Sequence, residues 1–447
     1  MNHTRRQFLS AWAGVIACRK AAAASADGLL EVSIEARPGL GMIAGIPTSY
    51  WGYNGLLPGL RLEARPGDTI RIHFRNSLPE PTNLHFHGLH VPPTGNADNV
   101  FLDVPPSGDF DYEVPIPSSH PSGAFWYHPH RHGSASRQVY RGLAGLIIVR
   151  GDLDDIPEIA GAREQFMVLQ DFTVDCNGQI PEPNRMEQMQ GREGSTLLVN
   201  GEVNPTFFIE RNGLLRCRFL NASSSRYYRL KIEDHPMAIL ALDGGALPAP
   251  IWAEEWLLAP GQRVDLLIAG DRQPGSYRIL NLPYNRGSMG MVSTQAPVVL
   301  ARLDYSGIAE MPVPVPSRLL DTMPLPQPTE LRRFILSEGM MGSFQINGKS
   351  FSPYRVDTTV MLGAVEDWEI DNFTFMDHPF HVHVNPFQLV RSDGAVESEL
   401  RDVINVVRGS RCRIRMRFAD YAGKTMYHCH ILDHEDLGMM GTLEIKT

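Results

Sequence analysis

The 447-residue sequence lacks several features that mark common functional classes. No apolar run approaches the roughly 20 residues that a membrane-spanning helix requires. Positive charge is not in excess, because 41 Lys and Arg face 50 Asp and Glu, for a formal net charge of −9. A nucleic-acid partner would require a basic surface, so this balance argues against one. We therefore expect no transmembrane segment and no nucleic-acid binding.

Cysteine and helical periodicity are also scarce. Five cysteines in so long a chain do not make a dense disulfide framework. We expect Cys176, Cys217 and Cys412 to be buried thiols, with one disulfide among them as the alternative in an oxidising compartment. Short alternating runs are bounded by many of the 40 glycines and 34 prolines. This pattern predicts strands and turns, and thus an all-β protein.

The first 26 residues resemble a targeting signal. Arg5 and Arg6 precede a short apolar run, and a tract of small residues follows in which cleavage would fall at Ala24 or Ala26. The pattern predicts a twin-arginine signal and a periplasmic or otherwise exported protein. The alternatives are a buried N-terminal helix and a lipid anchor at Cys18.

One pattern occurs three times along the chain. A polar turn leads into an alternating strand that ends in asparagine, in RPGDTIRIHFRNSL at Asn76, RNGLLRCRFLNAS at Asn221 and AVEDWEIDNFT at Asn372. The similar intervals predict three β-domains in tandem, each a Greek-key barrel or sandwich. We predict a signal at 1–26, domains at 27–150, 151–310 and 329–447, and a proline-rich extended linker at 311–328.

Ten of the 16 histidines fall in four clusters, two in the first repeat and two in the third. The clusters are His85 and His87; His128 and His130; His378, His381 and His383; and His428, His430 and His434. Residues i and i+2 of a strand point to the same side, so each His-x-His pair directs two imidazoles to one place. One such pair is weak evidence, but four pairs in two matching repeats predict metal binding.

The segment YHCHILDHEDLGMM, residues 427–440, adds a thiol to the imidazoles. In a strand, Cys429 would point away from the side that His428 and His430 share. A thiolate, two imidazoles and a weak thioether make a blue-copper electron-transfer site. The candidate ligands are His378, Cys429, His434 and Met439. Zinc is the alternative, since it also binds Cys and His, but zinc could not use the covalent link to the neighbouring histidines to pass electrons.

With these motifs the chain resembles the multicopper oxidases, in particular bacterial three-domain laccases and cuprous oxidases. NLHFHGL, FWYHPHRHG, MDHPFHVHVNPFQ and HCHILDHEDLGMM carry the resemblance, which covers nearly all of the chain after the first 26 residues. It implies three cupredoxin domains and four copper ions. It also implies a small-molecule reductant, oxidised one electron at a time, and dioxygen, reduced to water. We expect a monomer.

The resemblance assigns ligands position by position. It implies type 1 copper at His378, Cys429, His434 and Met439; type 2 copper at His85 and His381; and a type 3 pair at His87, His128, His130, His383, His428 and His430. No ligand position is vacant, whereas a copper-free cell-division member of the family has lost these residues.

Two acids stand where the family has carboxylates near the copper ions. Asp98 matches the acid near type 2 copper and Glu435 the one near the type 3 pair, so both are candidate proton relays. The alternatives are a turn aspartate at Asp98 and a hydrogen-bonding support at Glu435. Asp377 and Asp433 are expected to orient ligands instead.

Three substrate hypotheses stay open. A laccase would oxidise phenols or aromatic amines, whereas a metallo-oxidase would oxidise Cu(I) in copper tolerance. Relatives that oxidise Cu(I) carry a long methionine-rich insertion, and here only SMGM (288–291) and GMMG (339–342) are rich in methionine. The broad laccase-like hypothesis is therefore preferred. The third hypothesis is a copper-binding protein without turnover.

Overall fold

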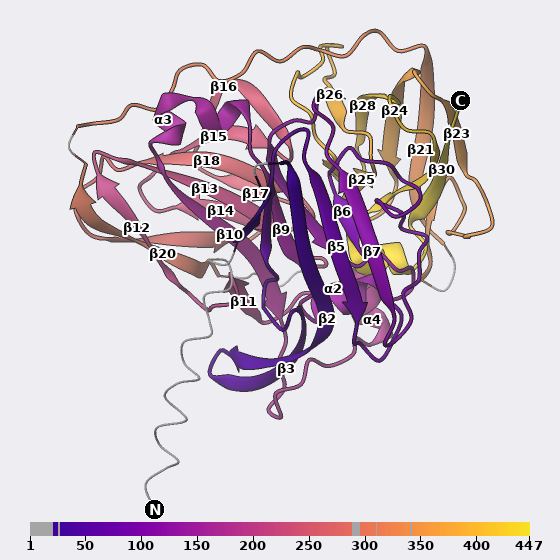
Figure 1. The fold of residues 1–447 in the computed structure, drawn as a ribbon, viewed down its shortest axis with the longest axis horizontal. Coiled ribbons are helices and arrows are strands. Elements are labelled where there is room, and N and C mark those ends of the chain that lie inside the picture. The colour runs from indigo at the N-terminus through magenta and orange to yellow at the C-terminus, as the bar shows by residue number, and fades with distance from the viewer. Residues whose placement is uncertain (1–20, 26, 288–295, 310, 340–341) are drawn as a thin grey trace, which may run out of the picture.

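The computed structural model describes residues 21–25, 27–287, 296–309, 311–339 and 342–447, and most of its regular structure is β-strand (Figure 1). The predicted signal lies mainly outside these residues. Of it, only 21–25 are described, and there β1 (Ala21–Ala23) pairs in parallel with β4 (Arg61–Ala64). No helix in the described part of the chain is long and apolar enough to cross a membrane.

The strands form six sheets, two in each successive third of the chain. We call these thirds the first unit (21–149), the second unit (163–308) and the third unit (330–446). In the first unit the sheet orders are β1, β4, β9 (Gly145–Val149), β8 (Gly123–His128), β6 (His85–His87), and β3 (Ile46–Tyr53), β2 (Leu29–Ile43), β5 (Thr69–Asn76), β7 (Asp109–Pro115).

The second and third units repeat this two-sheet plan. In the second unit the orders are β11 (Thr196–Val199), β10 (Arg163–Phe172), β13 (Leu214–Asn221), β18 (Arg263–Ala269), β15 (Met237–Leu242), β16 (Gly245–Ala253), and β12 (Thr206–Arg211), β20 (Val298–Ile308), β19 (Ser276–Leu282), β14 (Tyr228–Ile232), β17 (Trp256–Leu258). In the third they are β22 (Phe344–Ile346), β21 (Glu330–Glu338), β24 (Val365–Asn372), β28 (Arg411–Arg417), β26 (Phe387–Val390), and β23 (Thr358–Met361), β30 (Met440–Lys446), β29 (Gly423–Cys429), β25 (His378–Val382), β27 (Val403–Val406).

The three asparagines of the sequence repeat occupy equivalent places, at the ends of β5, β13 and β24. In each case the side-chain oxygen accepts a hydrogen bond from the backbone N–H two residues on, and the amide nitrogen donates to two backbone carbonyls. These bonds satisfy the buried polar atoms of the turn that follows each strand. The same local chemistry therefore closes the same turn in all three units.

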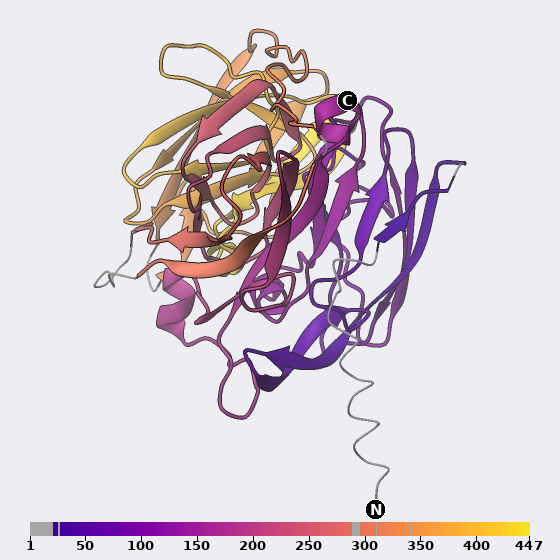
Figure 2. The same cartoon turned by 90° about the vertical axis from the view of Figure 1, so that its left-hand side faces the viewer.

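Each unit buries its own apolar core, which includes Phe74 in the first unit, Ile268 in the second and Trp368 in the third. A smaller cluster joins the first and second units, where Trp126 packs with Leu220. In Figure 2 the second unit faces the viewer, with the first unit at the right and the third at the upper left. The units thus pack around a shared centre.

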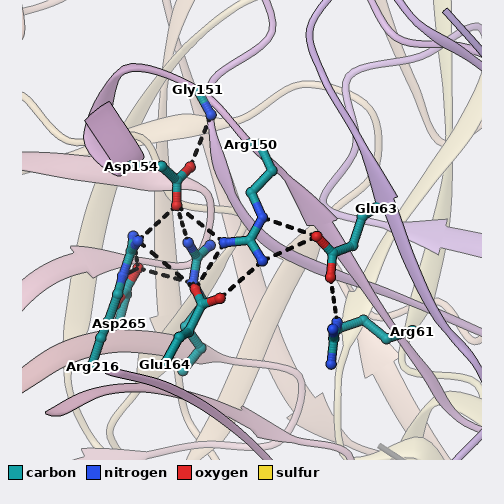
Figure 3. Close-up of polar contacts among 9 residues, drawn as sticks. Arg61, Glu63, Arg150, Gly151, Asp154, Glu164, Arg216 and Asp265 are labelled. Atoms are coloured by element: carbon teal, nitrogen blue, oxygen red, sulfur yellow. Dashed lines mark hydrogen bonds and ion pairs between the residues drawn. The ribbon is translucent and has the colours of Figure 1, made fainter. Parts of the chain in front are cut away.

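An ion-pair network also joins the first and second units (Figure 3). Arg150, which follows β9, bonds to Glu63 on β4 at 3.1 Å and to Glu164 on β10 at 2.9 Å. Arg216 on β13 bonds to Asp265 on β18 and to Asp154, both at 2.6 Å. Buried charges are costly unless they are paired, and here each has a partner of opposite sign.

Helices are short and few among the described residues. They are α2 (Ala135–Tyr140), α3 (Pro157–Ala160), α4 (Arg185–Gln190) and α5 (Leu432–Asp436), with a 3-10 turn at Asp152–Asp155. Helix α5 follows β29 directly and packs against α2 and α4, so residues from all three parts of the chain meet there. Residues 311–328 form neither helix nor strand and run from β20 to β21, as the orange trace along the top of Figure 1 shows.

The cysteines differ from expectation at one position. Cys176, Cys217, Cys412 and Cys429 are all free thiols, so no disulfide joins the described cysteines. Cys217 is buried and Cys412 is half-buried, but Cys176 is exposed rather than buried. It lies in the loop after β10, where the alternating pattern that buries every second residue of a strand no longer applies.

Candidate metal centres

The histidine pairs lie on paired strands with the same register in two units. In the first unit β6 pairs with β8 and places His85 opposite His128. In the third unit β25 pairs with β29 and places His381 opposite His428. Antiparallel pairing therefore brings two His-x-His motifs side by side in each unit.

Eight histidines meet between the first and third units, and we call them the histidine cluster. They are His85, His87, His128, His130, His381, His383, His428 and His430, and all are buried. The two units interleave here, because the His85 ring stacks on His383 with centroids 4.0 Å apart and the His87 ring stacks on His381 at 3.9 Å. The burial of apolar surface does not explain why so many polar imidazole rings pack together.

The hydrogen bonds of the ring nitrogens explain this packing. His85 Nδ1 donates to Asp98 at 2.8 Å and His128 Nδ1 to the Pro129 carbonyl at 3.0 Å, which leaves their Nε2 atoms buried without a hydrogen-bond partner. His381 likewise donates from Nδ1 to a backbone carbonyl at 2.8 Å and leaves Nε2 unpartnered. A histidine held at one nitrogen and open at the other is the usual arrangement of a metal ligand. The cluster therefore fits copper, for which imidazole is a preferred donor.

Burial favours the neutral form of His128 and His130. Removal from water lowers the pKa of His128 to about 3 and that of His130 to about 4, and neighbouring histidines add to the effect. A neutral imidazole keeps a lone pair for a metal ion, whereas a protonated one does not. The neutral imidazoles can therefore bind metal cations, although they carry no formal charge.

A second group combines one thiol with two imidazoles, and we call it the thiolate site. It consists of His378, Cys429 and His434, all fully buried. His378 Nδ1 lies 3.3 Å from both Cys429 Sγ and His434 Nδ1, and Sγ lies 4.0 Å from His434 Nδ1. The three donor atoms therefore face one point, as a blue-copper site requires.

The opposite nitrogens of the thiolate site are also held. His378 Nε2 lies 2.8 Å from Thr374 Oγ1, and His434 Nε2 donates to the Met189 carbonyl at 3.1 Å. Met439 is buried in the same apolar cluster as Cys429. Burial raises the pKa of the Cys429 thiol, and a metal ion bound to the sulfur would deprotonate it outright.

The two predicted acids both lie at the histidine cluster, in different states. Asp98 accepts from His85 Nδ1 and from the Phe86 N–H, and burial raises its pKa to about 8. Burial alone would also raise the pKa of Glu435, but His130 and His428 beside it hold that pKa well below the usual range. Glu435 Oε2 lies 3.1 Å from His428 Nδ1.

Asp377 and Asp433, which were expected to orient ligands, bind other groups instead. Asp377 accepts from the Tyr284 hydroxyl and the Arg408 N–H, and Asp433 from the Ser136 hydroxyl and the Arg192 N–H. These bonds fix loops around the metal centres; the described hydrogen bonds join neither acid to a ligand histidine.

The sequence reasoning missed Asp402, which does contact the cluster. Its Oδ1 accepts from His87 Nε2 at 2.9 Å and its backbone carbonyl accepts from His381. Nothing in the local sequence ELRDVIN (399–405) distinguishes this aspartate from an ordinary turn residue. Thr374, which contacts His378, was also missed. Its only signal in the sequence is its position two residues after the repeated Asn372 and shortly before the histidine segment.

Comparison with known proteins agrees with this geometry. Three family models, each described as multicopper oxidase, match residues 40–154, 164–307 and 323–447. A multicopper oxidase of Staphylococcus aureus is 31% identical over 404 residues, which are 88% of this chain and 83% of the relative. The chain belongs to the multicopper oxidase family. It is thus an oxidoreductase that depends on copper and uses oxygen as acceptor.

Structural similarity supports the same family and the cupredoxin-like fold predicted from the sequence. A multicopper oxidase of Campylobacter jejuni, described as a metallo-oxidase, is 33% identical with a TM-score of 0.84 over 96% of each chain. The cell division protein FtsP of Photorhabdus laumondii is also similar, at 28% identity over 414 residues, 89% of this chain and 85% of the relative. The family therefore spans proteins with different roles.

Proposed function

We propose that this multicopper oxidase takes single electrons from phenols or aromatic amines and uses them to reduce dioxygen to water. The proposed type 1 ligands are His378, Cys429, His434 and Met439; the type 2 ligands are His85 and His381; and the type 3 ligands are His87, His128, His130, His383, His428 and His430. Copper bound there, four ions in all, would supply one-electron chemistry at the thiolate site and oxygen reduction at the histidine cluster.

One observation carries the proposal: the two centres lie on either side of a single residue. Cys429 belongs to the thiolate site, whereas His428 and His430 belong to the histidine cluster. His428 Nδ1 also lies 3.0 Å from the Cys429 carbonyl oxygen. The chain thus offers a covalent path from the Cys429 sulfur to the neighbouring imidazoles, and the contact of His428 with the Cys429 carbonyl gives a shorter polar route along it.

Asp98 and Glu435 are proposed to hold and pass protons at the histidine cluster. Both carboxylates are buried, and each reaches a ring nitrogen of a proposed ligand, His85 for Asp98 and His428 for Glu435. Oxygen reduction consumes protons, and a buried cluster needs carriers within hydrogen-bond reach. Asp98 lies in the loop between β6 and β7, whereas Glu435 lies on α5, and these separate positions support proton delivery from two places.

A pocket of about 950 Å³ supports an organic reductant. Tyr227 and Tyr284 line it with stacked rings, 5.4 Å apart between centroids, and Tyr227 packs in the same apolar cluster as Cys429. Both imidazoles of the thiolate site are fully buried. An aromatic reductant in this pocket would therefore contact an aromatic surface that packs in the same apolar cluster as Cys429, rather than the ligands themselves.

The charges of the pocket favour a neutral reductant over a cation. Among its described acids, Glu193 pairs with Arg226 and Arg286, Glu182 pairs with Arg141, and Glu187 caps its own helix. No methionine is among the described residues that line it. A Cu(I) site would need soft thioethers, and the described walls of the pocket supply none.

Oxidation of Cu(I) is the alternative function, and helix α4 favours it. Met186 on α4 is 57% exposed, and the carbonyl of Met189 on the same helix holds His434. The similar protein from C. jejuni is a metallo-oxidase. Met289, Met291, Met340 and Met341, which the sequence offers as further thioethers, lie outside the described residues.

Oxygen uptake with a model phenol, and with Cu(I) in parallel, tests these functions. Faster uptake with the phenol supports the laccase-like function, and uptake with Cu(I) alone would overturn it. Tyr284→Leu should raise KM for the phenol and leave Cu(I) oxidation unchanged, with Tyr284→Phe as the matched variant that keeps the ring. Full copper loading without uptake from either donor would instead indicate a non-catalytic copper protein.

Export by the twin-arginine route is proposed on the sequence of residues 1–26 alone. Arg5→Lys combined with Arg6→Lys should leave the protein in the cytoplasm, where cell fractionation would find it. Unchanged export of the double variant would contradict the proposed route.

A further inference from the structure

The second unit holds none of the proposed copper ligands, yet it contacts the histidine cluster through one turn, residues 259–263. Gly261 in this turn has φ +82, and a Cβ there would come within 2.9 Å of the His430 ring. Two residues on, Arg263 begins β18 and is fully buried. The turn thus places a permanent positive charge beside a group of neutral imidazoles.

Arg263 is bound to Asp402 by two hydrogen bonds, from Nη1 to Oδ1 at 2.6 Å and from Nη2 to Oδ2 at 2.5 Å. Its Nε donates to the Ala124 carbonyl of the first unit at 2.8 Å. Asp243, from the second unit, accepts from the backbone N–H groups of Arg263 at 3.0 Å and Asp402 at 3.2 Å. A planar guanidinium held at both ends allows the carboxylate one orientation.

Asp402 in turn contacts two proposed ligands from different units. Its Oδ1 accepts from His87 Nε2 at 2.9 Å, and its backbone carbonyl accepts from His381 Nδ1 at 2.8 Å. The opposite nitrogens, His87 Nδ1 and His381 Nε2, are buried without a partner. An ionised carboxylate accepts hydrogen bonds and cannot donate them, so this contact places the His87 proton on Nε2 and leaves Nδ1 open.

We propose that Arg263 is a positioning residue of the histidine cluster: by fixing Asp402, it sets the ring orientation and tautomer of His87 and holds His381 in place. The first unit makes room for this clamp at Gly88, directly after His87, where a Cβ would come within 2.6 Å of the Asp402 carboxylate and 2.5 Å of the Arg263 guanidinium. The second unit, which holds none of the proposed copper ligands, thereby controls metal binding in a centre formed by the first and third units. This inference rests on the proposed ligand assignment.

The test compares Arg263→Lys with Arg415→Lys in the full-length chain. Arg415 is an apt control, since it is equally buried and binds Asp367 by two hydrogen bonds at 2.7 and 3.1 Å, but touches no ligand. Lysine keeps the positive charge in both variants but cannot form bidentate hydrogen bonds to a carboxylate. Differences between the variants thus report on the cluster and not on the loss of a buried arginine.

The readouts are copper content per chain, the blue absorption of type 1 copper, the electron paramagnetic resonance spectrum of type 2 copper and the melting temperature of the copper-free protein. Arg263→Lys should keep the blue absorption, lose about 10- to 100-fold in affinity for cluster copper and show an altered type 2 spectrum. Arg415→Lys should keep full copper and the wild-type spectrum. The two copper-free variants should melt at similar temperatures.

A second variant tests the inference if Arg263→Lys does not fold. Arg263→Met combined with Asp402→Asn removes both charges, so no unpaired charge is left buried. Its asparagine can turn and is held by no guanidinium, so the cluster should still lack copper while the protein is blue. Full cluster copper with a wild-type type 2 spectrum, in this variant or in Arg263→Lys, would overturn the inference. A wild-type chain without any type 2 signal would overturn the proposed function itself, and the inference with it.

Discussion

The thiolate site and the histidine cluster are assembled in opposite ways. All three donors of the thiolate site come from the third unit, between His378 and His434, and two of them lie five residues apart. The histidine cluster draws four imidazoles from the first unit and four from the third, and Arg263 of the second unit acts on it by binding Asp402 of the third unit. One centre is thus local to a single unit, whereas the other depends on how units pack together.

This difference predicts that the two centres can be damaged separately. Substitutions of the thiolate-site donors should affect electron entry, whereas substitutions in the histidine cluster, at the contact between units, should affect oxygen reduction first. A substitution of Cys429 should affect both functions, because the path between the centres runs from this residue to its neighbour His428.

The largest effect is expected from Cys429→Ser. A serine hydroxyl cannot provide the thiolate that gives a type 1 copper its blue colour, so colour and activity should vanish together. Absorption spectra and oxygen uptake measure both. A variant that stays blue would remove Cys429 from the thiolate site and, with it, the path between centres.

His383→Ala should separate the centres. The ring of His383 lies in the histidine cluster, stacked on His85, and contacts no residue of the thiolate site among the described ring contacts. Stopped-flow mixing should show the blue centre reduced by a phenol at the normal rate and not reoxidised by dioxygen. Normal reoxidation would contradict the assignment; His130→Ala, on the first unit's side, should behave in the same way.

Asp98→Asn should give a smaller effect, confined to oxygen reduction. The amide can still accept from His85 and Phe86 but cannot pass on a proton, so turnover should fall by roughly 100-fold with full copper content. Elemental analysis and reoxidation kinetics provide the measurement. A loss of copper together with stability would indicate a structural aspartate, and unchanged turnover would leave Glu435 as the remaining candidate.

The smallest effect on either centre is expected from Arg216→Gln in the network of Figure 3. The variant removes the guanidinium that hydrogen-bonds to the buried Asp265, which should cost about 3 kcal/mol of stability and lower the melting temperature. Both spectra should stay at wild type, because the network joins the first and second units away from the histidines. Arg278→Gln, in an exposed pair with Glu233, should change little by comparison. Loss of cluster copper in Arg216→Gln would show that this contact also governs the histidine cluster.

Much of the site could be predicted from short motifs. Each His-x-His pair needed only the two-residue period of a strand, and the alternation around Cys429 predicted correctly that it would face away from its neighbours' cluster. The repeated asparagines predicted three similar units for the same reason, since a buried amide closes each turn. Exposure of Cys176 was missed because loop burial depends on neighbours that the strand pattern does not describe.

Sequence by itself determined which donors are present and how they are paired, because spacing on a strand fixes which side chains share a face. It also determined the all-β fold, through alternation and turn residues. Only the tertiary structure decided which nitrogen of each imidazole is free, which acid holds it, and that Arg263 and Asp402, far apart in the chain, meet at His87. Those contacts arise between units, where the geometry of packing and not any local period sets the distance between charged atoms.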